Sequence, residues 1–231
     1  MAKRRKPAKD DDATSARLPR GPHTLTREEV AANQQARMMS AMIELVGEQG
    51  YGPTTVAQVT ARAGVSRKAF YEHFANKEEC IIALFDRAIA SSPNCADAWV
   101  RSSPTYSYLG DGEEAKRRAR LGQRLSPLDA HLFFTHAVLC LACYSAANFD
   151  EAAVWGRKAL NQNPNFTANL RLLTASLAAA GQLSEARDIG RRLLEAEPRF
   201  RVTPFCEAYA FRDPARRAAM ADHLRAAGLP D

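Results

Sequence analysis

The sequence of 231 residues predicts an all-α protein built from two parts. Residues 55–74 have the pattern of two short helices joined by a tight turn. Further along the chain, Pro93, Pro127, Pro164 and Pro198 are separated by 34, 37 and 34 residues, the period of a repeated pair of helices. Alanine is frequent and β-branched runs are few, so the composition favours helices over strands.

The first 26 residues are rich in charge, proline and glycine, and we expect a basic arm that is disordered when free. Residues 1–24 hold seven Lys or Arg and three Asp, a net charge of +4 within the +6 of the whole chain. Such an arm follows the phosphates of a nucleic acid or is a solvated tail without a role, and the sequence leaves both readings open.

A long helix is predicted over residues 27–49. Thr26 and Glu29 have the spacing of a capping box, in which each side chain accepts a hydrogen bond from a backbone N–H at the start of the helix. Gly50 ends the helix. Apolar side chains at helical spacing form its expected buried stripe: Met38, Met42, Leu45 and Val46, flanked by Met39 and Ile43.

The next two helices are short and lie on either side of a glycine. Thr55 and Gln58 have the spacing of a second capping box. Gly64 follows, where a helix can end with a positive φ at the least cost. Ser66 is a favourable N-cap for the helix after the turn.

The second of these helices has two different faces. Phe70 and Phe74 are four residues apart and are expected to point to the core. The opposite face carries basic and hydrogen-bonding side chains: Arg67, Lys68, Tyr71 and His73. This arrangement is typical of a helix-turn-helix whose second helix enters the major groove of DNA.

The stretch GYGPTTVAQVTARAGVSRKAFYEHFANKEEC resembles the N-terminal DNA-binding domain of TetR-family transcriptional regulators. The resemblance runs from about Arg27 to Ala88, and one departure is Thr60, where the family usually has alanine. It implies a domain of three to four helices over residues 27–92, with the helix-turn-helix at 55–74. Asn76 caps the fourth helix.

The resemblance and the helix-turn-helix pattern together assign eight residues to DNA. Residues at the start of the recognition helix are expected at base edges: Ser66, Arg67, Lys68 and Ala69. Four others are assigned to phosphates, which position the helix without reading sequence: Thr55, Tyr71, His73 and Lys77. The phosphate role of Lys77 is what the resemblance implies.

The remainder of the chain has the signature of tetratricopeptide (TPR) repeats. Ala115, Ala152 and Ala186 each lie twelve residues before a proline of the periodic series, and each follows a loop. We predict repeats at about 96–129, 130–166 and 167–200, with a C-terminal cap at 201–231. The three extra residues of the second repeat are expected to lengthen its first helix.

We place the TPR-like domain at residues 93–231. From about Asn94 to Asp231 it is similar to the TPR segment that closes some bacterial multidomain signalling proteins, including certain class III adenylate cyclase-like chains. The cyclase catalytic domain itself is absent from the sequence. The resemblance therefore implies an interaction module without catalysis.

Other motifs favour packing over chemistry. Cys140 and Cys143 form a CxxC without a second pair of ligands at metal spacing, so two core cysteines are the preferred interpretation. His131 and His136 are not at helical spacing to each other, and we expect neither to have a neighbouring carboxylate. The basic run 116–120 suits the solvated outer face of a repeat, as do Arg191-Arg192 and Arg216-Arg217. We find no catalytic constellation and predict a non-enzyme without cofactor or metal.

The sequence therefore predicts a sequence-specific transcriptional regulator that binds double-stranded DNA and acts as a repressor. We expect a homodimer and a protein or peptide in the TPR groove. The alternative is a TPR adaptor whose helix-turn-helix is not the working part. The five cysteines are odd in number, and no secretion signal or membrane-length apolar run is present, so we expect a cytoplasmic protein that contacts no membrane.

Overall fold

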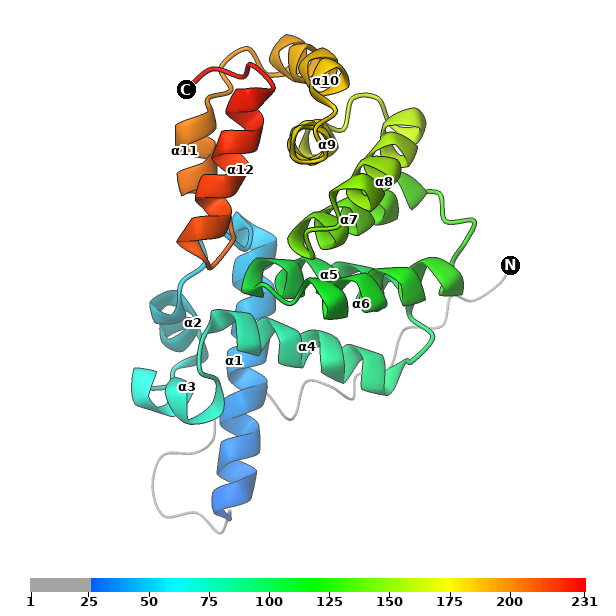
Figure 1. Ribbon diagram of the computed structural model, residues 1–231. Coiled ribbons are helices and arrows are strands. Elements are labelled where there is room, and N and C mark those ends of the chain that lie inside the picture. Colours follow the sequence, from blue (N-terminus) through cyan, green and yellow to red (C-terminus); the bar gives the residue numbers. More distant parts are fainter. Residues whose placement is uncertain (1–25) are drawn as a thin grey trace, which may run out of the picture. The chain divides into compact units, whose positions relative to one another are not determined.

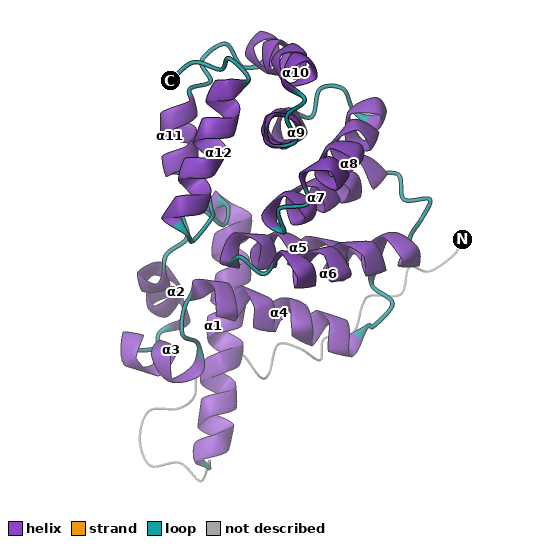
Figure 2. Ribbon diagram, viewed as in Figure 1, coloured by secondary structure: helices purple, strands orange, loops and turns teal. Residues whose placement is uncertain are grey.

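The computed structural model describes residues 26–231, and all the regular structure in this part of the chain is helical (Figures 1 and 2). The prediction of an all-α fold is confirmed. The expected basic arm lies outside the described residues, apart from Thr26. The chain divides into two compact units between Leu84 and Phe85, a point inside the fourth helix.

The first unit contains α1 (Arg27–Gln49), α2 (Val56–Ala63), α3 (Arg67–His73) and the start of α4 (Lys77–Ser91). The capping box predicted at the start of α1 is present, with Glu29 N donating to Thr26 Oγ1 at 3.1 Å. Most of the predicted stripe of α1 is buried, but Ile43 is 60% exposed. Each residue of an α-helix is rotated by about 100° from the last, which carries Ile43 past the edge of the stripe.

The second unit is an array of helical pairs. They are α5 (Ala96–Leu109) with α6 (Gly112–Leu125), α7 (Leu132–Ser145) with α8 (Phe149–Gln162), and α9 (Thr167–Ala179) with α10 (Leu183–Ala196). Figure 1 shows α5, α7 and α9 on the inner side of a curve, with α6, α8 and α10 outside them. The array follows the periodic pattern of the sequence and is TPR-like.

The prolines and alanines of the period have the structural places that the sequence predicts. Each of the four prolines lies two residues after the last residue of a helix, as Pro127 does after α6. Ala115, Ala152 and Ala186 are fully buried, at 0% exposure, on the second helix of each pair. Their methyl groups allow the paired helices to approach closely.

The expectation that α7 is lengthened is wrong. α5 and α7 both have 14 residues. α7 begins five residues after Pro127, whereas α5 and α9 begin three residues after Pro93 and Pro164, so two of the three extra residues lie in the loop before α7. Lengthening a surface loop costs little entropy, whereas a longer α7 would extend beyond its partner α8.

The turns inside the three pairs share one backbone feature. A residue with positive φ occurs in each turn: Gly110 (+96°), Ala147 (+58°) and Gly181 (+76°). Ala147 has a side chain that disfavours this conformation, and it is the one residue other than glycine with positive φ in the part of the chain that the structure describes.

The basic run of α6 is not a uniformly solvated face, contrary to expectation. Lys116 and Arg118 are only 7% and 6% exposed. The Arg118 guanidinium forms ion pairs with Asp86 at 2.8 Å and Glu114 at 2.7 Å and lies over the ring of Tyr106. Alternating exposure arises because the run winds around the helix, so some of its members face α5 and α7.

The C-terminal cap consists of α11 (Val202–Glu207) and α12 (Pro214–Ala226). Asp213 is the N-cap of α12, and Gly228 follows its end with a φ of +82°.

The last helix, α12, packs against α9 and reaches α7, where Tyr144 Oη lies 2.8 Å from His223 Nδ1. Arg216 is not on a solvated face: its Nη1 donates to the backbone oxygen of Ser145 at 2.6 Å. Part of the inner face of the array is therefore covered by the chain's own C-terminal helix.

Candidate nucleic-acid interface

Helix α3 is oriented by its cap and by two aromatic side chains. Ser66 Oγ accepts a hydrogen bond from Ala69 N at 3.0 Å, which confirms the predicted N-cap. Phe70 and Phe74 are 0% and 2% exposed, and their ring centroids lie 5.5 Å apart. Burial of both rings fixes the rotation of α3 about its axis, so the opposite face points to solvent.

The exposed face of α3 carries cationic and aromatic side chains. Arg67 and Lys68 are exposed, and Lys68 Nζ lies 3.9 Å from Glu72 Oε1 on the following turn. Tyr71 is 57% exposed and lies edge-on to Phe70. His73, the last residue of α3, is half-buried.

Ala69 does not share this face, contrary to expectation. It is only 8% exposed and lies on the buried side of α3 with Phe70. Because consecutive residues of a helix are rotated by about 100°, the four residues 66–69 span most of a turn and cannot all face the same way.

The turn between α2 and α3 is held from α1. Gly64 ends α2 in the left-handed conformation, with φ +62° and ψ +40°, as predicted. Arg37 of α1 donates through Nη2 to the backbone oxygens of Ala63 and Gly64. A cation at the C-terminus of a helix is attracted by the carbonyl groups that the helix leaves unpaired.

Helix α2 is also held by an ion-pair network that sequence reasoning missed. Arg62 binds Glu48 through two hydrogen bonds of 2.9 Å and Glu44 through one of 3.1 Å. The hydrogen bond from Arg62 holds the pKa of Glu48 below its usual value. These partners lie 14 and 18 residues apart in the sequence, beyond any helical periodicity.

The start of α2 has the predicted capping box. Thr55 Oγ1 accepts a hydrogen bond from Gln58 N at 3.3 Å, and Gln58 Oε1 accepts one from Thr55 N at 2.9 Å. Thr60, the departure from the family pattern, is buried and its hydroxyl donates to Ala57 O at 3.1 Å. The hydroxyl group is thus satisfied within its own helix.

The family resemblance implies that Lys77 contacts a DNA phosphate. In the structure, Lys77 instead binds backbone oxygens of its own chain. Its Nζ donates to the backbone oxygens of Tyr51 and Gly52 at 3.2 Å each and of Thr54 at 3.1 Å. Lys77 is half-buried, and Nζ lies 4.4 Å from the centroid of the Tyr51 ring. At the same end of α4, Asn76 Oδ1 accepts from Glu79 N at 2.8 Å, the predicted cap.

The CxxC cysteines lie in the core of the second unit. Cys140 and Cys143 are fully buried, and Cys140 Sγ lies 3.6 Å from Ser176 Oγ. Burial raises the pKa of the Cys140 thiol to about 12, so it stays protonated at neutral pH. In residues 26–231 no group of three His, Cys, Asp or Glu side chains has the arrangement of a metal site.

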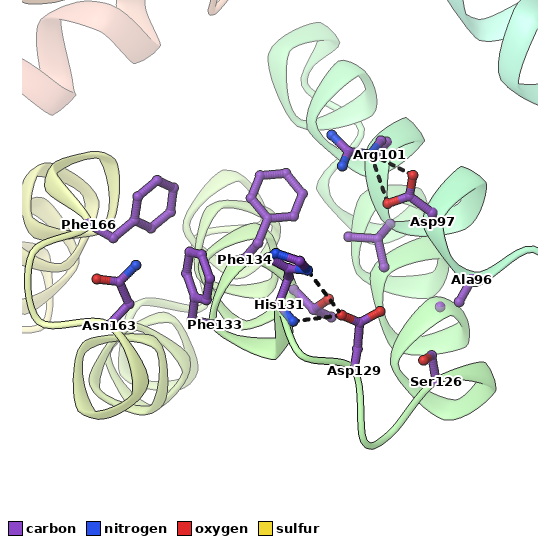
Figure 3. A pocket seen from close by; sticks show the side chains of 13 residues that line it. Ala96, Asp97, Arg101, Ser126, Asp129, His131, Phe133, Phe134, Asn163 and Phe166 are labelled. Carbon is purple, nitrogen blue, oxygen red and sulfur yellow. Dashed lines mark hydrogen bonds and ion pairs between the residues drawn. The ribbon is translucent and has the colours of Figure 1, made fainter.

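A cavity of about 530 Å³ opens in the second unit near the first turns of α5 and α7 (Figure 3). Its apolar lining includes three aromatic rings: Phe133, Phe134 and Phe166. Arg101 Nε binds both carboxylate oxygens of Asp97, at 2.8 and 2.7 Å, and the backbone N–H of His131 donates to Asp129 at 2.7 Å. The loop that contains the extra residues of the second repeat forms one wall.

Comparison with known proteins identifies the first unit. Residues 39–84 match the family model described as bacterial regulatory proteins, tetR family. The uncharacterized HTH-type transcriptional regulator YxbF of Bacillus subtilis (strain 168) is 31% identical over 86 residues, 37% of this chain and 22% of that protein. The HTH-type transcriptional regulator CymR of Pseudomonas putida is 35% identical over 65 residues, 28% of this chain and 32% of that protein. The chain thus spans about a fifth to a third of these relatives' length.

Solved structures with some similarity include MamA, with a TM-score of 0.47 and 14% identity over 75% of this chain and 93% of that chain. Another is YrrB, described as a TPR protein with an unusual peptide-binding site, with a TM-score of 0.44 and 18% identity over 82% of this chain and 91% of that chain. Among the helices that the structure describes, none combines the length and apolar character needed to cross a membrane.

Proposed function

The chain carries a TetR-type helix-turn-helix domain followed by a TPR-like array of helical pairs, and from this premise we propose that it is a sequence-specific transcriptional regulator that acts as a repressor. Double-stranded DNA is its partner, and the DNA-reading domain comprises residues 27–92. Residues 93–231 supply protein interaction or dimerisation. Because the matched family is bacterial and bacterial DNA lies in the cytoplasm, we place its action there.

The observation that carries the proposal is the exposed pair Arg67 and Lys68 at the start of α3, opposite the two buried phenylalanines. Within residues 26–231, neither cation has a strong partner that would hold it away from a duplex, because the contact of Lys68 with Glu72 is long and exposed. Arginine and lysine donate to the O6 and N7 acceptors of guanine in the major groove. Ser66 stands beside them at the N-terminus of the helix. Ala69 is left out of this group because it is buried.

Phosphate contacts are proposed for three further residues around α2 and α3, of which Thr55 and Tyr71 are exposed and His73 is half-buried. Thr55 lies at the exposed N-terminus of α2, where backbone N–H groups favour an anion. Tyr71 and His73 lie on α3 beyond the proposed base-reading residues. Hydroxyl and imidazole donors of this kind position a recognition helix without reading the sequence.

The test begins with selection of duplexes from a random pool by the full chain, followed by gel-shift titration. Arg67→Ala is expected to relax base preference and to weaken binding to the selected duplex by about 1–3 kcal/mol, the discrimination that one bidentate contact provides. Arg191→Ala is the matched control, because this arginine is exposed on α10 and far from the helix-turn-helix in sequence. If wild type and Arg67→Ala bind every duplex with equal affinity, the proposal is wrong.

A homodimer is part of the proposal, since a palindromic operator needs two recognition helices at a set spacing. The mass of the chain in solution, measured by light scattering with and without the selected duplex, tests it. A chain that is monomeric without DNA and binds the selected duplex as a single copy contradicts the dimer.

A second candidate function is an adaptor that holds a protein or peptide partner, and the cavity near α5 and α7 favours it. An apolar lining beside the Arg101–Asp97 ion pair and the Asp129 carboxylate suits a peptide side chain. An adaptor keeps its partner in a pull-down when Arg67 and Lys68 are both replaced by alanine, and it binds no duplex. A regulator loses DNA binding in the same variant.

A further inference from the structure

The ammonium group of Lys77 has all its donors engaged. A lysine ammonium has three N–H donors and no acceptor. Three backbone oxygens, those of Tyr51, Gly52 and Thr54, lie 3.1–3.2 Å from Nζ. A phosphate that bound Nζ would therefore have to take an N–H from at least one of these carbonyl groups.

The three carbonyl groups belong to the connection that leads from α1 into α2. Thr54 is 1% exposed and its hydroxyl donates to Gly50 O at 2.8 Å, which ties the two ends of the connection together. The next residue, Thr55, caps α2. Tyr51 is held to α4 a second time, because its hydroxyl donates to Glu78 Oε1 at 2.6 Å.

Without a cation among them, three converging carbonyl dipoles repel one another, and those left dry and unpaired cost free energy. We propose that Lys77 is a positioning residue of the DNA-binding surface: it holds residues 51–54, sets the start of α2 and so places Thr55, and it does not itself bind a phosphate. This inference rests on the proposed function. It differs from the role that the family resemblance implies for Lys77.

Salt dependence separates the two roles. Lys77→Met keeps the aliphatic stem and removes the charge. If Lys77 is a positioning residue, this variant binds every duplex at least about fivefold more weakly, the effect of one unpaired acceptor, with an unchanged slope of log affinity against log salt. If Lys77 binds a phosphate, the slope becomes shallower by about 0.9, and that result overturns the proposal. Lys77→Arg supplies donors to the same carbonyl groups and is expected to restore most of the affinity.

A double-mutant cycle tests whether Lys77 acts through the start of α2. Lys77→Met and Thr55→Ala are expected to be coupled. If they were independent, the fold-loss of DNA affinity in the double variant would equal the product of the two single fold-losses; we expect it to be smaller than that product by at least about threefold. Lys77→Met and Arg67→Ala act on different segments and should multiply to within about twofold. Independent effects in the first pair would refute the positioning role.

A measurement without DNA keeps this inference separate from the proposed function. Hydrogen exchange at the backbone amides of Thr55 and Gln58, the two that the capping box binds, is expected to be at least about tenfold faster in Lys77→Met than in wild type, because the start of α2 opens more often. Arg67→Ala is the control, with exchange at these amides unchanged. If exchange in Lys77→Met equals that of wild type, the positioning role is wrong. If the wild-type chain binds no duplex, the proposed function fails while the exchange result still decides the role of Lys77.

Discussion

Two glycines inside outer helices of the array are predicted to respond in opposite ways to the same substitution. Gly122 lies in α6 and Gly190 in α10, and both are buried. A Cβ on Gly122 would lie 2.5 Å from Val100 Cγ2 and 2.8 Å from the backbone oxygen of Ala96. A Cβ on Gly190 would come no closer than 3.5 Å to any of its neighbours, the nearest being Leu229 Cδ2.

The magnitudes follow from two opposing effects. Alanine in a helix interior is favoured over glycine by about 0.8–1.0 kcal/mol. At Gly190 the added methyl group is in ordinary van der Waals contact, so Gly190→Ala is expected to raise the free energy of unfolding by about 1 kcal/mol. At Gly122 the methyl group meets a backbone oxygen that no side-chain rotation can move away, and overpacking costs about 1–3 kcal/mol or more. Because two contacts of the added Cβ are shorter than 3.0 Å, we expect the upper part of that cost, about 2–3 kcal/mol, and subtracting about 1 kcal/mol of helix propensity leaves a net loss of about 1–2 kcal/mol.

Urea unfolding followed by far-UV circular dichroism measures both variants against wild type. For a chain of this size, 1 kcal/mol corresponds to about 2–4 °C in Tm, so thermal unfolding gives an independent reading of the opposite signs. If Gly122→Ala is as stable as wild type, or if both variants shift in the same direction, the close approach of α5 and α6 described above is wrong.

Two further predictions concern the second unit. Ala147 holds a φ of +58°, a conformation that costs a residue with a side chain about 1 kcal/mol, so Ala147→Gly should raise the free energy of unfolding by about 0.5 kcal/mol after the greater unfolded-state entropy of glycine is subtracted. Gly181→Ala at φ +76° should lower it, and urea midpoints that do not differ among the three chains contradict the reasoning. His136 is buried between Gln123 and Gln162, and burial lowers its pKa below the ordinary value of 6.5. The unfolded chain then takes up the proton first, so this contribution to stability is intact above about pH 6.5 and is lost as the pH falls below it. His136→Gln should make the urea midpoint depend less steeply on pH between about pH 7 and pH 5.5. A pH dependence as steep as that of wild type would contradict the role given to His136.

Much of the local structure follows from the sequence because its causes lie within one helical turn. The capping boxes at Thr26 and Thr55, the N-cap at Ser66 and the left-handed Gly64 each involve residues at most a few positions apart. The prolines that follow α4, α6, α8 and α10 likewise act on the helix just before them. Such interactions are encoded by spacing, and spacing is visible in a sequence.

Which side chains of a short run on a helix are exposed does not follow from the sequence. Ala69 was expected beside Arg67 on the outer face of α3, and Lys116 and Arg118 on the outer face of α6, yet all except Arg67 are buried. A run of similar residues winds around a helix, and which of them are buried depends on where the neighbouring helices lie. Composition alone does not contain that information.

The sequence by itself determined the class of the fold, the helix-turn-helix and the repeat period, and it placed the cationic face of α3 opposite Phe70 and Phe74. The tertiary structure decided what the other functional candidates touch. Lys77 meets carbonyl groups 23–26 residues away, Arg37 meets the end of α2 26–27 residues away, and Arg216 meets Ser145 across 71 residues. Contacts at such separations exist only once the helices have packed, because a cation binds whichever carbonyl groups the fold brings within its reach.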